Sequence, residues 1–230
     1  MIGFFDSGVG GFNSLFALRK ALPLADIIYL ADRKNAPYGT KTEDEVLSLA
    51  NKNIKRLSEM GAKKILIACC TASTLWDKLP REQKMISMPI ILPAVNCLDN
   101  NNKRIMVIAT ERTVSSKFFS RAIFVRFPEA YVVEVAMQSL VSAVEEGIKN
   151  RNLFSSTLGD IKRLVCLFEE YIPDTLVLGC THFSSVEHII HKALPDVNII
   201  NPAYIGAMEM IKCIADCGIN TRESGRLIYT

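Results

Sequence analysis

Short apolar segments alternate with longer stretches of helical periodicity along this chain. The apolar segments predict strands at residues 2–5, 26–30, 64–68, 90–93, 104–108, 131–135, 175–178 and 198–200. Strands that alternate with helical segments are typical of parallel sheets whose crossovers are helices. We therefore predict an α/β fold.

The clearest helix is predicted over residues 43–59. Thr42 and Glu45 have the spacing of a capping box at its start, and Gly61 follows its end. Both ends of this helix are thus marked by residues that favour helix termini.

The polar segment at residues 98–103 interrupts the strand pattern with turn-forming residues and predicts a domain junction. The two parts that it separates show a weak internal repeat. Residues 64–71 echo residues 175–182, because each is an apolar strand that ends in Cys with Thr soon after. The opening strand, which leads into residues 6–8, has a counterpart in 104–108, which leads into 109–110. We predict two similar domains.

Parallel sheets bind ligands beyond the carboxyl ends of their strands. Cys69 and Cys180 follow equivalent strands of the repeat. If the two domains face each other, these thiols lie on opposite sides of one ligand. The repeat therefore predicts a single pocket that draws on both halves.

Composition narrows the class of protein. Of the 230 residues, 49% are hydrophobic and 22% are charged, and the net charge is +3 with both signs interspersed. This excludes a disordered chain and gives no nucleic-acid or membrane footprint. The apolar runs are far shorter than the roughly 20 residues of a membrane span, and the first residues lack the pattern of a signal peptide. We expect a cytoplasmic protein whose partner is a small molecule.

The seven cysteines are an odd number and lie among apolar neighbours, which favours reduced thiols over a disulfide framework. Inverting a carbon centre requires a base on one face and an acid on the other. A thiol pair suits both roles, because the ordinary thiol pKa of about 8.5 can be moved by its environment. A single Cys at a strand end is equally a small buried hydrophobe. The repetition of a strand-end Cys beside a hydroxyl residue favours a catalytic role.

Six motifs follow one another as they do in glutamate racemases, which are members of the aspartate/glutamate racemase family. They are FDSGVGG at 5–11, APYGT at 36–40, ACCTAS at 68–73, IAT at 108–110, VEEG at 144–147 and LGCTH at 178–182. The resemblance covers nearly the whole chain. It implies an isomerase that interconverts L- and D-glutamate, supplies D-glutamate for peptidoglycan, cell wall and cell shape, and uses no cofactor, pyridoxal phosphate or metal.

The resemblance also implies an architecture of two pseudosymmetric parallel-sheet α/β domains with the active site in the cleft between them. The N-terminal domain would comprise residues 1–97 and 207–230, with the last helix returning to it, and the C-terminal domain residues 98–206. A homodimer is compatible with the resemblance, but the sequence does not state an oligomer arrangement.

By resemblance, Cys69 and Cys180 match the catalytic thiols, each acting as base for one enantiomer and acid for the other. Asp6 matches a carboxylate that assists the first thiol, and Glu145 and His182 match residues that assist the second. Carboxylates and imidazoles near a thiol can take or deliver its proton. The plainer alternatives are a turn carboxylate for Asp6 and a backbone-bonded helix terminus for His182.

A further set matches positions that hold the carboxylates and ammonium group of the amino acid: Ser7, Pro37, Tyr38, Gly39, Cys70, Thr71, Thr113 and Thr181. Hydroxyls and backbone N–H groups at strand-to-helix turns suit this task, although local capping would explain the hydroxyls as well. The glycines after Asp6 do not form a dinucleotide fingerprint, because Asn13 occupies the third glycine position. We interpret them as backbone flexibility at the pocket.

Two segments depart from the family pattern. Cys70 stands where the family has Asn, and a thiol replaces an amide poorly as donor and acceptor. Met-Gln-Ser at 137–139 stands where the family has Cys-Pro-Leu. The alternatives are therefore a racemase for aspartate or another amino acid, or a weakly active relative that binds an amino acid or a protein. An oxidoreductase using adjacent Cys69 and Cys70 is disfavoured, because such a disulfide closes a strained ring.

Two other features carry less weight. Cys213 and Cys217 have helical spacing, but no second pair of ligands lies near them in the sequence to indicate zinc. His188 and His191 are expected to face solvent.

Overall fold

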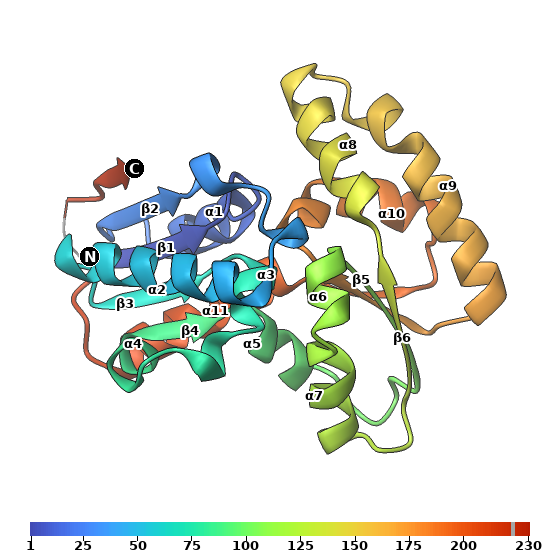
Figure 1. The fold of residues 1–230 in the computed structure, drawn as a ribbon, viewed down its shortest axis with the longest axis horizontal. Coiled ribbons are helices and arrows are strands. Elements are labelled where there is room, and N and C mark those ends of the chain that lie inside the picture. The colour runs from blue at the N-terminus through green and yellow to red at the C-terminus, as the bar shows by residue number, and fades with distance from the viewer. Residues whose placement is uncertain (222–223) are drawn as a thin grey trace.

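The computed structural model describes residues 1–221 and 224–230, which form two parallel sheets side by side (Figure 1). The first sheet has the order β4-β3-β1-β2-β9, with β1 (Ile2–Asp6), β2 (Ile27–Ala31), β3 (Lys64–Ile67), β4 (Ser87–Pro89) and β9 (Leu227–Tyr229). The second has the order β6-β5-β7-β8, with β5 (Arg104–Ala109), β6 (Tyr131–Ala136), β7 (Thr175–Gly179) and β8 (Asn198–Ile200).

Four strands of each sheet follow one order, since β4-β3-β1-β2 corresponds to β8-β7-β5-β6. The two segments that echo each other in the sequence, 64–71 and 175–182, begin with the equivalent strands β3 and β7. Strands β1 and β5 are likewise equivalent and central. The predicted α/β fold of two similar parallel-sheet domains is therefore confirmed, and β9 is an extra strand at the edge of the first sheet.

Seven of the eight predicted strands are present, with ends that differ by at most one residue. The prediction of a strand at residues 90–93 is wrong. The strand β4 ends at Pro89, and α5 (Ile91–Asn96) follows. Ile90 is buried and lies so close to α11 (Pro202–Asp216) that a Cβ on Gly206 would be 2.5 Å from its Cγ1. A short apolar run is compatible with either a buried strand or a buried helix, so periodicity could not decide between them.

Helix α2 (Glu43–Glu59) has the predicted bounds. The capping box is formed, because the N–H of Glu45 donates to Thr42 Oγ1 at 3.3 Å and the N–H of Thr42 donates to Glu45 Oε2 at 2.8 Å. Gly61 has a φ of +93°, the left-handed conformation that commonly ends a helix.

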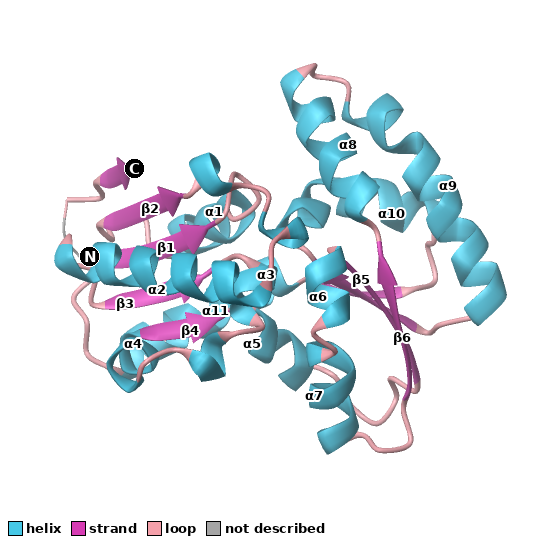
Figure 2. Cartoon of the chain, in the orientation of Figure 1, coloured by secondary structure: helices cyan, strands magenta, loops and turns pink. Residues whose placement is uncertain are grey.

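Alternate residues of the central strands face opposite helical layers. Phe4 of β1 packs with α1 (Phe12–Ala21), α5 and α11 (Pro202–Asp216), whereas Phe5 packs with α2. In the second sheet, Ile108 of β5 packs with α8 (Gln138–Lys149), α9 (Leu153–Tyr171) and α10 (Glu187–Ala193). Figure 2 shows these helices on both faces of the sheets. The shorter helices are η1 (Arg33–Asn35), η2 (Tyr38–Thr40), α3 (Cys70–Ser73), η3 (Trp76–Lys78), α4 (Arg81–Ile86), α6 (Glu111–Ser115), α7 (Phe118–Arg126) and η4 (Thr181–Val186).

The last helix lies against the first sheet. Helix α11 packs against α1 and α5, and β9 pairs in parallel with β2. The precise domain boundaries at residues 97 and 207 stay a prediction. In the part of the chain that the structure describes, no helix combines the length and apolar character that crossing a bilayer requires.

Candidate functional site

The candidate site lies where the two sheets meet. In Figure 2 the arrowheads of β1, β2 and β4 point toward the second sheet. In each sheet the chain passes from the central strand, β1 or β5, to a neighbour on one side and then crosses to a neighbour on the other side. Open α/β sheets bind ligands at such a switch point, beyond the carboxyl ends of the strands. One cavity there draws on both sheets and is lined by Ser7, Gly8, Ala36, Pro37, Tyr38, Gly39, Cys69, Cys70, Thr71, Thr110, Gln138, Val141, Glu145, Cys180, Thr181 and His182.

The structure brings most of the expected residues together in this cavity. Asp6 and Thr113 are the two that do not line it. Asp6 lies behind the cavity wall, bonded to Gly8 and Thr181, and Thr113 lies behind Thr71 and Thr110. The sequence prediction omitted Gly8, Ala36, Thr110, Gln138 and Val141. Thr110 could have been found, because it follows the strand equivalent to β1.

Cys69 follows β3 and is buried, with its Sγ 3.5 Å from Ser7 Oγ. Burial raises the pKa of this thiol to about 12, and the nearby carboxylate of Asp6 adds to the increase. Cys69 is therefore a neutral thiol near pH 7, ready to donate a proton.

Asp6 is fully buried at the end of β1. Its Oδ1 accepts the N–H of Gly8 at 2.7 Å, and its Oδ2 accepts the hydroxyl of Thr181 from the second sheet at 3.3 Å. Burial raises the pKa of Asp6, although the charge of His182 and these hydrogen bonds oppose the increase. A carboxylate with a raised pKa is a stronger base than an exposed one.

Cys180 has a different partner. Its Sγ is 3.6 Å from Nδ1 of His182, and His182 Nε2 is 3.0 Å from Oε1 of Glu145 on α8. The second contact is an ion pair without hydrogen-bond geometry. Burial alone would lower the pKa of His182, but the contacts with Cys180 and Glu145 raise it to about 10. His182 is thus an imidazolium near pH 7, placed to stabilise negative charge on the sulfur.

Three buried threonine hydroxyls join the two halves. Thr71 Oγ1 is 3.0 Å from Thr110 Oγ1 and 3.2 Å from Thr113 Oγ1, and the last two are 2.9 Å apart. Thr71 belongs to α3, whereas Thr113 belongs to α6 of the second domain. Thr113, expected to bind the substrate, instead holds the two hydroxyls that line the cavity.

Gly10 and its neighbours permit close packing. A Cβ on Gly10 would lie 2.4 Å from Thr181 Oγ1 and 3.0 Å from the backbone nitrogen of His182. Gly8, Gly10 and Gly11 all lie outside the positive-φ region. The structure gives Gly10 a steric reason, since any side chain there would push the loop after β7 away from Asp6. The interpretation as backbone flexibility stays a prediction.

The hydroxyl of Tyr38 points away from the cavity. It donates to Asp32 Oδ2 at 2.6 Å, and Asn53 Nδ2 donates to the same carboxylate at 3.0 Å. Burial on its own would raise the pKa of Asp32, but these donors lower it. Tyr38 and Gly39 therefore reach the cavity through their backbone and the tyrosine ring, on a turn that Asp32 anchors. The sequence carried no signal for Asp32.

We expect Tyr38→Phe to lower the free energy of unfolding by about 1.5–3 kcal/mol, because it removes a hydrogen bond to a charged acceptor. Turnover should change little, since the hydroxyl faces away from the cavity. Urea denaturation and steady-state kinetics check both results. Tyr204→Phe, at an exposed tyrosine, is the matched control. A large loss of kcat with unchanged stability would contradict this role.

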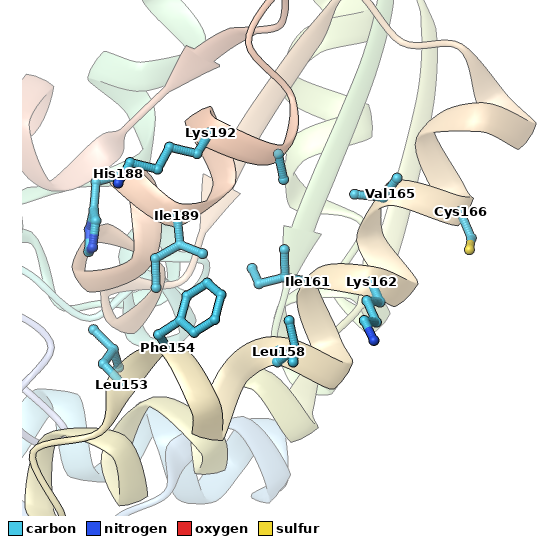
Figure 3. A pocket seen from close by; sticks show the side chains of 11 residues that line it. Leu153, Phe154, Leu158, Ile161, Lys162, Val165, Cys166, His188, Ile189 and Lys192 are labelled. Carbon is cyan, nitrogen blue, oxygen red and sulfur yellow. The ribbon is translucent and has the colours of Figure 1, made fainter.

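A larger apolar pocket lies apart from this site (Figure 3). It is formed by α9 and α10, and Figure 3 shows Cys166 and His188 on opposite sides of it. No acid–base pair is formed there among the described residues. His188 and His191 are exposed, as predicted. The described residues also contain no cluster of three or more His, Cys, Asp or Glu side chains that could hold a metal ion.

Comparisons with known proteins give the family. The model of the Asp/Glu/Hydantoin racemase family matches residues 16–210. A glutamate racemase of Gloeobacter violaceus is 33% identical over 212 residues, which cover 91% of this chain and 79% of the relative. That of Neisseria meningitidis is 34% identical over 99% of this chain and 85% of its own. The crystal structure of glutamate racemase from Francisella tularensis in complex with D-glutamate superposes with a TM-score of 0.86 at 29% identity, covering 99% and 86% of the two chains. The chain belongs to the Asp/Glu/hydantoin racemase family and is an amino-acid racemase, an isomerase.

Proposed function

We propose that this protein interconverts L- and D-glutamate, with Cys69 and Cys180 as the opposed acid and base. The observation that carries the proposal is the pair of thiols that follow equivalent strands of two sheets and line one cavity, each with its own proton partner. The similarity to proteins named glutamate racemase supports glutamate as the substrate. By the same resemblance, the D-glutamate would serve peptidoglycan synthesis in the cytoplasm.

The proton transfers follow from the two environments. With His182 protonated beside it to stabilise negative charge on the sulfur, Cys180 is placed to remove the Cα proton from one face. The electron pair of the C–H bond stays on carbon, and neutral Cys69 donates its proton to the opposite face. Inversion leaves Cys180 as a thiol and Cys69 as a thiolate.

The opposite enantiomer requires Cys69 to be the base. Asp6, whose pKa burial raises, lies close enough to influence Cys69 electrostatically and is suited to accept its proton. His182 then supplies the proton of Cys180. The thiol pair and these partners provide both proton transfers, so the proposed mechanism needs no cofactor.

Neutral donors surround the substrate position. Ser7, Thr71 and the Tyr38–Gly39 turn line the cavity, and their side-chain hydroxyls at Ser7 and Thr71 and backbone N–H groups in the turn suit carboxylates without adding charge. Thr181 lines the cavity as well, but its hydroxyl donates to Asp6. Glu145 and the buried Asp6 supply negative charge to attract an ammonium group. This distribution suits an acidic amino acid.

Exchange at Cα tests the proposal. The protein is incubated in deuterated water with single enantiomers of glutamate, aspartate and uncharged amino acids, and deuterium incorporation and inversion are followed together. We expect both enantiomers of glutamate to incorporate deuterium and invert. Inversion of aspartate or another amino acid in preference to glutamate would assign the alternative substrate, and absence of exchange with the whole panel would refute the activity.

Cys70 is the departure from the family pattern that bears most directly on which amino acid binds, because this buried thiol lines the cavity. We expect Cys70→Asn to tighten glutamate binding by up to about 1.5–3 kcal/mol, the value of a hydrogen bond to a charged group, because the amide is a better donor than the thiol. Measuring kcat/KM for the same panel in both proteins checks this result. If glutamate is not the natural substrate, the variant should improve glutamate and impair the true ligand. Unchanged ratios would mean that Cys70 does not contact the substrate.

A further inference from the structure

The carboxylates of a dicarboxylate substrate need hydrogen-bond donors, and cationic side chains do not supply them in this cavity. No Lys or Arg side chain lines the cavity among the residues that the structure describes. Arg33 and Lys149 line an outer pocket, which shares Gly8, Ala36, Pro37 and Glu145 with the cavity. Cations there can attract an anionic substrate, but its carboxylates must be held inside by neutral donors.

Gln138 is the single carboxamide in the lining of the described cavity. It is the first residue of α8 and follows β6, so it lies at the carboxyl end of the second sheet. A Cβ on Gly39 would be 2.6 Å from Gln138 Oε1 and 2.7 Å from Thr110 Cβ. The amide therefore sits where the Tyr38–Gly39 turn meets Thr110, beside groups that face the substrate position.

The oxygen of this amide is unsatisfied. Gln138 Oε1 is buried and has no hydrogen-bond partner among the described residues. Buried polar atoms are normally paired, and an exception in a cavity indicates a partner that arrives with the ligand. A half-turn of the amide exchanges its oxygen and nitrogen with little change of shape. Neither the oxygen nor the nitrogen of this amide is hydrogen-bonded to a described residue, so the turn breaks no hydrogen bond and presents an N–H donor instead.

We propose that Gln138 binds a carboxylate of the substrate and supplies the amide that Cys70 does not. This inference rests on the proposed function, because it takes an acidic amino acid as the ligand. The two departures from the family pattern, Cys70 and Gln138, then compensate each other within one cavity: an amide is missing from α3 and another is present on α8.

The first test is Gln138→Ala, compared with Ser139→Ala. Ser139 is the next residue, is exposed, and donates to Asp160 Oδ1 at 2.5 Å, outside the cavity. We expect Gln138→Ala to raise KM for glutamate about tenfold, the loss of one hydrogen bond to a charged group, while kcat changes little and the melting temperature stays near that of the wild type. Ser139→Ala should leave KM unchanged.

Two further variants separate binding from structure. Gln138→Glu keeps the shape but puts a negative charge beside the substrate carboxylate, so we expect weaker binding than in Gln138→Ala. Adding Cys70→Asn to Gln138→Ala should restore much of the lost affinity and gain more than Cys70→Asn gains in the wild type, because the wild type already has the amide of Gln138. Such rescue is not expected from a residue that only supports α8.

The outcomes distinguish this inference from the proposed function. A wild-type enzyme that racemises glutamate, with an unchanged KM in Gln138→Ala, overturns the role of Gln138 alone. Tighter glutamate binding by Gln138→Glu also overturns it, because the amide would then face the ammonium group. A wild-type protein without activity on any amino acid of the panel overturns the proposed function itself.

Discussion

We expect Cys69→Ser and Cys180→Ser each to abolish racemisation while substrate binding persists. The reason is that an alcohol has a far higher pKa than a thiol and cannot remove the Cα proton, and loss of one general acid or base costs roughly 10²–10⁴-fold in rate. Both cysteines are buried, and serine is smaller by only the difference between oxygen and sulfur, so the cavity should keep its shape. Polarimetry measures the inversion, and calorimetry measures binding.

The single variants should also separate exchange from inversion. In Cys69→Ser, Cys180 still deprotonates one enantiomer, but no acid delivers a proton to the other face. That enantiomer then incorporates deuterium without inverting, and its mirror image does not exchange. Cys180→Ser should show the opposite preference. Cys97→Ser, at an exposed cysteine, is the control and should behave as the wild type. Inversion in both directions at an undiminished rate in either variant would falsify the two-thiol mechanism.

Most of the fold could be predicted because it depends on patterns that are local in the sequence. The strands β3 and β7 are apolar runs that are followed by Cys-Cys-Thr and Cys-Thr. The ends of α2 are marked by Thr42, Glu45 and Gly61. The strand predicted at residues 90–93 is wrong because this apolar run packs against α11, more than 100 residues later in the sequence, where Ile90 lies against Gly206. Tertiary contacts of this kind leave no local signal.

The candidate site divides in the same way. Residues at strand ends, such as Cys69, Cys180 and Asp6, could be placed from the repeat and the family motifs. Gln138 and Asp32 could not, because their importance depends on an unpaired oxygen and on a hydrogen bond to Tyr38. Thr113 carries the expected hydroxyl, but only the fold shows that Thr71 and Thr110 stand in front of it.

His182→Gln should lower kcat by about 10²-fold, within the range for loss of a group that moves a proton. The imidazole contacts Cys180 on one side and Glu145 on the other, and glutamine cannot carry a positive charge or exchange a proton with the sulfur. Binding should be less affected than turnover. Glu145→Gln should have a smaller effect, because the Glu145 side chain is 49% exposed and solvent screens its charge. His188→Gln, at an exposed histidine, is the control.

The stability of the folded protein should depend on pH through the same histidine. Its pKa is raised from 6.5 to about 10 in the folded state. A raised pKa means that the folded state binds the proton more tightly, so the stabilisation is complete below about pH 6.5 and is lost as the pH rises through about 10. The difference in unfolding free energy between the wild type and His182→Gln should therefore shrink across this interval, as measured by urea denaturation at a series of pH values. A constant difference from pH 6 to pH 10 would show that His182 is not held as a cation, and Cys180 would then lack the charge that the mechanism assigns to its partner.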